Sequence, residues 1–279
     1  MPQTKHQIES LLAEAGAGPR PQFGQNFMID QNLVRAVADA GRVSGDDLVI
    51  EVGPGTGTLT EELLDRAGQV LAVEIDRGLA ALLRKNLGNR PNFSLLEGDA
   101  LAGKHELDPQ LLDAIVEARK SRRPVKLVAN LPYNIASPLV IEMLVAGTEL
   151  LAFTVQKEVA DRLAAAAGTA EYGPLSVMAQ LLGRVEVLRK LPPQAFWPAP
   201  KIESALARLS RDDRLGPRAR PFSAFVHALF SFRRKMLRRA LAQAGWNAEA
   251  ALSATGFDGK MRAEELSPQS LLRLFLAVS

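Results

Sequence analysis

The segment Asp47–Leu64, DLVIEVGPGTGTLTEELL, joins an apolar run to an amphipathic run through a loop that contains three glycines. The apolar run predicts a buried strand, and the run from Thr58 predicts a helix. Glycine permits backbone conformations that other residues rarely adopt and lets a ligand approach the main chain. This order predicts an α/β fold with a nucleotide-like ligand at the loop. A tight strand-to-helix turn without a ligand is the alternative.

Short apolar runs alternate with amphipathic segments from about Gln31 to Ser210. Alternating strands and helices predict a parallel sheet that is covered by helices on both faces. Two further strand-like runs follow without a long helix between them, which predicts an antiparallel pair at one edge. The parallel strands are expected at 47–52, 69–75, 92–98, 125–131 and 151–156, and the edge pair at 184–191 and 203–210.

The charged segment SRDDRLGPRARP (210–221) predicts a linker. After it the pattern is helical, so we expect an α/β domain over residues 1–210 and a small helical domain over residues 211–279. Within the second domain, the run FVHALFSFRRKMLRRAL predicts one helix with a single apolar stripe. The residues of this stripe are Phe225, Leu229, Phe232, Met236 and Ala240.

The charge of the chain is unevenly distributed. The net charge is +3, but residues 211–279 hold 12 Lys and Arg against 6 Asp and Glu. The positive excess therefore lies in the last quarter of the chain. It indicates either an anionic partner there or a solvated basic helix face.

The composition argues against several kinds of site. The chain has no cysteine, and its three histidines are scattered without ligand spacing, so no metal site is expected. The first ten residues lack the apolar core of a signal peptide, and no apolar run approaches the length needed to span a membrane. We therefore expect a cytoplasmic protein, and a monomer.

Two carboxylates follow the next expected strands. Glu74 ends the second strand, 21 residues after Gly53, and Asp99 follows the third. On the rim of an open parallel sheet, such carboxylates accept hydrogen bonds from ribose hydroxyls and from an adenine amino group. The spacing Gly53-x-Gly55-x-Gly57 differs from that of pyrophosphate-binding loops, and no Walker lysine follows. An adenosine cofactor without a pyrophosphate, S-adenosylmethionine, is therefore predicted.

The pentapeptide NLPYN (Asn130–Asn134) follows the fourth expected strand and opens onto the same rim. The side-chain oxygen of Asn130 and the carbonyl of Leu131 would accept the hydrogens of an exocyclic amino group and direct its lone pair towards a methyl donor. Pro132 fixes φ and helps to direct that carbonyl, and Tyr133 offers a ring face to a base. The alternative is a turn whose Asn side chain satisfies nearby backbone groups.

Seven segments, which span roughly residues 20 to 245, together resemble the ribosomal RNA adenine N6,N6-dimethyltransferase family. The resemblance implies a class I methyltransferase fold, with a mostly parallel seven-stranded sheet and a small helical C-terminal domain. It also implies dimethylation of two adjacent adenosines in the 3′-terminal hairpin loop of small-subunit ribosomal RNA. The segments are QFGQNFMID, EVGPGTGTLT, NLPYN, VQKEVADRLAA, YGPLSVMAQ, FWPAPKIESA and SFRRKMLRRAL.

The same resemblance implies roles for individual residues. Asn26 and Met28, in the N-terminal segment 1–29, would close over the cofactor, and Gly53 would line its methionine moiety together with Gly55. Glu74 would bind the ribose, Asp99 the cofactor adenine, and Asn130 would bridge cofactor and target. Phe196 would form the target pocket with Tyr133, although an aromatic side chain packed under a loop is the alternative. The expected RNA contacts are Arg233, Arg234, Lys235, Arg238 and Arg239.

Two features depart from the family pattern. Met28 stands where the family usually has leucine, and the link over residues 104–124 is longer than usual and is expected to form an extra surface helix. The alternatives are a large-subunit ribosomal RNA methyltransferase that confers macrolide resistance, a non-catalytic assembly factor and a DNA adenine methyltransferase. The segments VQKEVADRL and FWPAPKIES favour the small-subunit enzymes, and the presence of Glu74, Asp99 and Asn130 favours catalysis.

Overall fold

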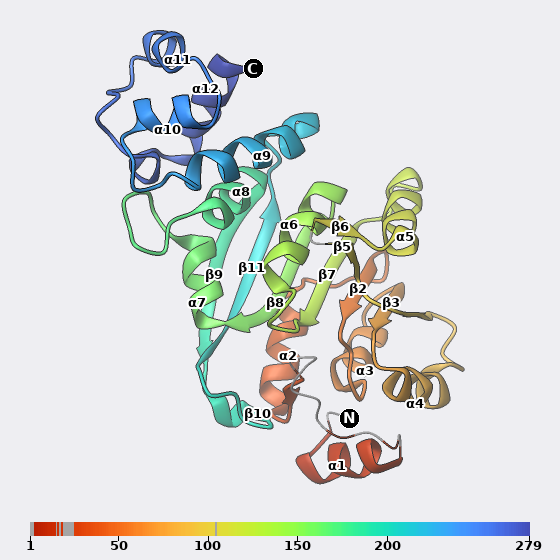
Figure 1. Cartoon of the computed structure of the whole chain (residues 1–279). Coiled ribbons are helices and arrows are strands. Elements are labelled where there is room, and N and C mark those ends of the chain that lie inside the picture. The colour runs from red at the N-terminus through yellow and green to blue at the C-terminus, as the bar shows by residue number, and fades with distance from the viewer. Residues whose placement is uncertain (1–2, 15, 17, 19–24, 104) are drawn as a thin grey trace. The chain divides into compact units, whose positions relative to one another are not determined.

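A computed structural model describes residues 3–14, 16, 18, 25–103 and 105–279 (Figure 1). The chain divides into two compact units. The first comprises the N-terminal part to Ala160 together with Glu186–Arg211, and the second comprises Asp161–Val185 and Asp212–Ser279. Each unit is described by itself.

A seven-stranded sheet forms the centre of the fold, in the order β4-β3-β2-β7-β8-β11-β9. The first five strands pair in parallel, as predicted, and β11 runs antiparallel to β8. The two late strand-like runs are neighbours at one edge, as expected. The strands are β2 (Leu48–Val52), β3 (Gln69–Glu74), β4 (Phe93–Glu97), β7 (Val125–Asn130), β8 (Leu150–Gln156), β9 (Gly183–Leu191) and β11 (Ser204–Arg211).

Helices cover both faces of this sheet. On β7, Val128 joins a buried cluster with side chains of α2, α3 and α4, whereas Leu127 and Ala129 point to the opposite face and are equally buried. Helix α5 packs on β7 and against α6. Asp30 and Asp76 cap α2 and α4 by accepting N–H groups of the first turn. The helices are α2 (Gln31–Ala40), α3 (Thr58–Leu64), α4 (Arg77–Leu87), α5 (Pro109–Lys120) and α6 (Ala136–Ala146).

The long link before β7 is not an added surface helix, and that expectation was wrong. Helix α5 begins at the cap Asp108, and its Leu111 and Ile115 are fully buried. Two parallel strands require a crossover that returns the chain to the same end of the sheet. Helix α5 is this crossover between β4 and β7, and the short hairpin of β5 (Leu101–Gly103) and β6 (Glu106–Leu107) precedes it.

The N-terminal part of the first unit contains a helix and a strand that the periodicity did not predict. Helix α1 (Lys5–Glu14) packs against α4 through the buried Ile8 and Leu12. Strand β1 (Phe27–Met28) pairs antiparallel with β10 (Phe196–Trp197), so the N-terminal segment and the proline-rich loop before β11 are joined by backbone hydrogen bonds. Residues 19–24 of the N-terminal segment lie outside the described residues.

The second unit is helical, but it contains more of the chain than residues 211–279. Residues 161–185 also belong to it, because the Tyr172 hydroxyl donates to the carbonyl of Leu266 and the Arg214 N–H donates to that of Leu181. The single boundary expected near residue 210 therefore needs this correction. Helix α7 (Lys157–Ala164) runs across the boundary at residue 160. The other helices of the unit are α8 (Pro174–Leu182), α9 (Ala219–Phe230), α10 (Leu237–Gln243), α11 (Ala248–Thr255) and α12 (Pro268–Val278).

The basic run of this unit is a turn between two helices, not the single helix that was expected. Helix α9 ends at Phe230 and α10 begins at Leu237. Between them the N–H groups of Phe232 and Arg233 donate to carbonyls three residues back, which tightens the chain and ends the α-helical pattern. Met236 is consequently 44% exposed, and Leu237, which is fully buried, replaces it in the core.

Candidate active site

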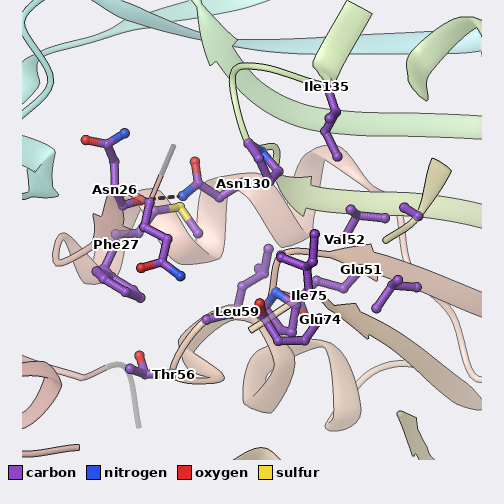
Figure 2. A pocket seen from close by; sticks show the side chains of 18 of the residues that line it. Asn26, Phe27, Glu51, Val52, Thr56, Leu59, Glu74, Ile75, Asn130 and Ile135 are labelled. Carbon is purple, nitrogen blue, oxygen red and sulfur yellow. Dashed lines mark hydrogen bonds between the residues drawn. The ribbon is translucent and has the colours of Figure 1, made fainter. Parts of the chain in front are cut away.

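A pocket lies at the carboxyl ends of the parallel strands (Figure 2). The strand order reverses between β2 and β7, and open α/β sheets bind ligands outside the strand ends at this reversal. The loops after β2, β3, β4 and β7 all contribute to the pocket. Among the residues predicted from the sequence, those that line it are Asn26, Met28, Gly53, Gly55, Glu74, Asp99, Asn130 and Pro132.

The glycine loop is shaped by contacts that exclude side chains. Gly53 and Gly55 have φ values of 73° and 61°, which L-residues rarely adopt. A Cβ atom on Gly55 would lie 2.9 Å from the ring of Phe27, and one on Gly53 would lie 3.1 Å from Pro132. The loop therefore packs directly against the N-terminal strand on one side and the NLPYN turn on the other.

Glu74 is a buried carboxylate of the pocket lining that binds two backbone N–H groups. Its carboxylate is 3% exposed and accepts the N–H of Gly55 at 3.1 Å and that of Asp76 at 2.9 Å. Burial raises the pKa of Glu74 to about 7, although these two hydrogen bonds act in the opposite direction. A carboxylate oxygen has two lone pairs, so acceptor capacity remains for ribose hydroxyls.

Asp99 and Ile75 form another part of the pocket lining. Asp99 is exposed and accepts the N–H of Leu101, whereas Ile75 is 44% exposed although it is apolar. An apolar surface beside a free carboxylate suits a flat ring that carries an amino group. Ile75 was not predicted from the sequence, although its position directly after the acidic strand end was an available signal.

Glu51 is a second residue of the pocket lining that was not predicted from the sequence. It lines the pocket, is 2% exposed, and its Oε2 atom has no hydrogen-bond partner among the described residues. Burial raises the pKa of Glu51 to about 8, and the nearby charge of Glu74 raises it further. A buried acid in an otherwise apolar strand was the signal that could have identified it. A ligand with positive charge would favour the ionised form of both acids.

Asn130 is held between two parts of the fold. Its Nδ2 donates to the carbonyl of Asn26 at 2.6 Å (Figure 2), and its Oδ1 accepts a hydrogen bond from the hydroxyl of Thr154. These contacts join the fourth parallel strand to the N-terminal segment and to the neighbouring strand β8. The carboxamide does not cap its own turn, which argues against the simple-turn alternative.

Leu131 and Tyr133 lie behind the pocket lining rather than in it. Leu131 is 1% exposed, and its N–H donates to the carbonyl of Thr154 at 3.2 Å. The half-buried ring of Tyr133 is fixed by a 2.7 Å hydrogen bond between its hydroxyl and that of Ser204 on β11. Burial raises the pKa of Tyr133, so its hydroxyl stays protonated at neutral pH.

Phe196 is not brought to the pocket in this structure. It is 2% exposed and belongs to the buried cluster that also contains Met28, Leu191 and Leu206. Its strand β10 is paired with β1, which directs the ring into the core. The alternative of an aromatic side chain packed under a loop describes this arrangement, so the expected stacking role of Phe196 has no geometric support here.

The N-terminal segment meets the pocket at several points. Met28 is buried and contributes to the lining, and the Gln3 side chain donates to the Thr56 carbonyl of the glycine loop at 3.0 Å. Phe27 stacks on Trp197 with ring centroids 6.4 Å apart. The described part of the segment is thus attached both to the glycine loop and to the loop that carries Phe196.

The raised pKa values predict a pH-dependent stability. Between about pH 4.5 and pH 8, the folded protein holds a proton on Glu51 that the unfolded chain has released. The free energy of unfolding should therefore fall as the pH rises through this range, by up to about 1.4 kcal/mol per pH unit for this group. Urea unfolding of the ligand-free protein at pH 5, 6, 7 and 8 measures the slope. Glu51→Gln should reduce it and stabilise the protein at pH 8, and parallel curves for the two proteins would contradict the assignment.

Two solved structures with the same architecture are named as a dimethyladenosine transferase and a 23S rRNA methyltransferase. A dimethyladenosine transferase from Plasmodium falciparum superposes with a TM-score of 0.70 at 21% identity, over 90% of this chain and 96% of its own. The 23S rRNA methyltransferase ErmE superposes with a TM-score of 0.64 at 31% identity, over 91% and 99%. The sheet order and the glycine loop with its acidic neighbour define a class I S-adenosylmethionine-dependent methyltransferase.

Sequence relatives identify the family within this class. The ribosomal RNA small subunit methyltransferase A of Magnetococcus marinus is 39% identical, over 93% of this chain and 92% of its own length. The protein of the same name from Moorella thermoacetica is also 39% identical, over 92% and 91%. A family model described as ribosomal RNA adenine dimethylase matches residues 17–279. The chain belongs to this family.

In the part of the chain that the structure describes, no helix is long and apolar enough to cross a membrane, and no group of three His, Asp or Glu side chains could hold a metal ion.

Proposed function

We propose that this protein transfers methyl groups from S-adenosylmethionine to N6 of two adjacent adenosines in the 3′-terminal hairpin loop of small-subunit ribosomal RNA. The observation that carries the proposal is the position of Asn130. Its carboxamide lies on the rim of the pocket with Glu74 and Asp99, in a chain of the ribosomal RNA adenine dimethylase family. The protein would act as a monomer in the cytoplasm, during late assembly of the small subunit.

The lining residues fit this cofactor. Glu74 would bind the ribose and Asp99 the adenine amino group, while Gly53 and Gly55, which also line the pocket, would contact the cofactor through their backbone. The positive charge of a bound sulfonium and ammonium group would favour the ionised form of the buried carboxyl groups of the pocket, Glu51 and Glu74. S-adenosylmethionine, when bound, supplies an electrophilic methyl group.

The task of the protein's own residues is to position the target amino group. The lone pair of an exocyclic amino nitrogen is delocalised into the ring, which makes it a poor nucleophile. Oδ1 of Asn130 and the carbonyl of Leu131 would accept the two N–H groups and favour a geometry in which the lone pair points out of the ring plane. Positioning of this kind contributes to the rate without a metal or a covalent enzyme intermediate. A general base is not needed early, because the proton becomes acidic once the nitrogen is alkylated.

The second unit offers a basic surface for RNA. Arg234, Lys235 and Arg239 are exposed, and none of them has an acidic partner within ion-pair distance among the described residues. Arg234 and Lys235 lie in the turn after α9, and Arg239 lies on the adjoining helix α10, so the three cations belong to one short stretch of the chain. We assign the phosphate contacts to this surface, which would supply affinity that is independent of sequence.

The direct test is methyl transfer from labelled S-adenosylmethionine to small ribosomal subunits that lack the modification. Mass spectrometry of the 3′ hairpin fragment should find two adjacent dimethyladenosines. Label in large-subunit RNA would favour the second candidate, a large-subunit adenine methyltransferase, for which the 31% identity to ErmE is the specific observation. Tight RNA binding without label in any RNA would favour an assembly factor instead.

A further inference from the structure

The side-chain amide of Asn130 is held by a residue of strand β8, outside the NLPYN segment. Thr154 lies within β8, where every residue before it is apolar, and pairs in register with Asn130 on the parallel strand β7. It is fully buried, and its hydroxyl donates to Oδ1 of Asn130. A buried hydroxyl that has lost water needs such a partner.

Thr154 also holds the second residue of the segment. Its backbone carbonyl accepts the N–H of Leu131 at 3.2 Å. One residue of the central sheet therefore contacts the Asn130 side chain through its hydroxyl and the backbone N–H of Leu131 through its carbonyl.

We propose that Thr154 is a positioning residue that fixes the carboxamide of Asn130 for methyl transfer. The amide has two orientations that differ by exchange of oxygen and nitrogen. The Asn26 carbonyl accepts only from the NH₂ group, and the Thr154 hydroxyl satisfies one lone pair of the oxygen. The second lone pair remains for a target N–H. Asn26 lies on the N-terminal segment, whereas Thr154 belongs to the central sheet. Thr154 is therefore the partner of the Asn130 amide that the sheet itself provides.

The inference rests on the proposed function, and the experiment separates the two. Thr154→Val keeps the shape of the side chain and removes the hydroxyl. We expect it to lower kcat for RNA methylation about 10-fold, the effect of one lost hydrogen bond, with cofactor affinity and the KM for RNA unchanged. Thr154→Ser keeps the hydroxyl and should restore wild-type kcat.

A matched control is available on the loop before the same strand. Thr148 is also fully buried, but its hydroxyl has no hydrogen-bond partner among the described residues. Thr148→Val should therefore leave kcat unchanged. If Thr154→Val does not fold, Thr154→Ala serves as the second variant without a hydroxyl.

A readout independent of activity is the ¹⁵N–¹H signal of the Asn130 side-chain amide, assigned by its loss in Asn130→Ala. It should move in Thr154→Val and stay in place in Thr154→Ser. Wild-type kcat in Thr154→Val, equal damage in the serine variant, or an unmoved amide signal would overturn the proposal. Absence of methyl transfer by the wild-type protein would instead remove the proposed function, while the amide signal would still decide whether Thr154 holds Asn130.

Discussion

Replacing Asn130 with alanine should lower kcat for adenine methylation by about 10²–10³-fold, which is the usual cost of removing one preorganised hydrogen-bonding group at a reacting centre. The reason lies in the geometry of the pocket. The carboxamide is held by Asn26 and Thr154, so its remaining lone pair is fixed before the target arrives. Alanine removes both the acceptor and the contact to the N-terminal segment.

The same substitution should weaken cofactor binding only moderately, by roughly 2- to 10-fold, because it removes one hydrogen bond that helps to close the pocket. Single-turnover methylation of small subunits measures the first quantity, and calorimetric titration with S-adenosylmethionine measures the second. Asn89→Ala, which changes an exposed carboxamide after α4, is the control and should behave as wild type. Unchanged turnover in Asn130→Ala would defeat the mechanism.

The location of this pocket could be predicted from the sequence because strand ends are local features. Each parallel strand was visible as a short apolar run, and parallel strands end on one rim. Gly53, Glu74, Asp99 and Asn130 each follow such a run, so their convergence required only the fold class. The structure places all four residues in the lining of one pocket, and their individual roles stay predictions.

Features that depend on contacts distant in sequence could not be predicted in this way. The burial of Phe196 results from pairing of its strand with β1, about 170 residues earlier in the chain. The break at 231–236 escaped the periodicity because Phe232 and Met236 are apolar although they lie in a turn. Thr154 was not predicted because the sequence does not show which residue faces a single threonine across the sheet. Only the pairing of β7 with β8 places it beside Asn130.

The second large effect is expected on RNA binding, from charges in the turn and helix that follow α9. Arg233 and Arg238 are paired with Glu264 and Glu249. Arg234, Lys235 and Arg239 are exposed cations without such partners in the described part of the chain. Unpaired cations lose less when they bind phosphate, because no existing ion pair has to be broken. The three should therefore carry most of the electrostatic affinity of this surface.

Changing these three residues together to glutamine should weaken binding to the small-subunit RNA by roughly 10²-fold at physiological salt. The slope of log affinity against log salt should become shallower by roughly 2 to 3, because each lost phosphate contact releases about one counterion fewer. A matched control removes three exposed cations of the first unit, with the substitutions Arg35→Gln, Arg42→Gln and Lys190→Gln. It changes the net charge equally and should leave the slope nearly unchanged.

The two large predictions also differ in the kinetic constant that should change. This difference tests whether the second unit serves RNA binding while the pocket of the first unit serves catalysis. Loss of the basic residues should raise the KM for RNA and leave kcat at saturating RNA close to wild type, because the groups around Asn130 are untouched. Loss of Asn130 should do the reverse. If the triple variant kept both its RNA affinity and its salt slope, the phosphate contacts would have to lie elsewhere. If it lost kcat at saturating RNA, the basic surface would be needed to assemble the active site as well as to bind RNA.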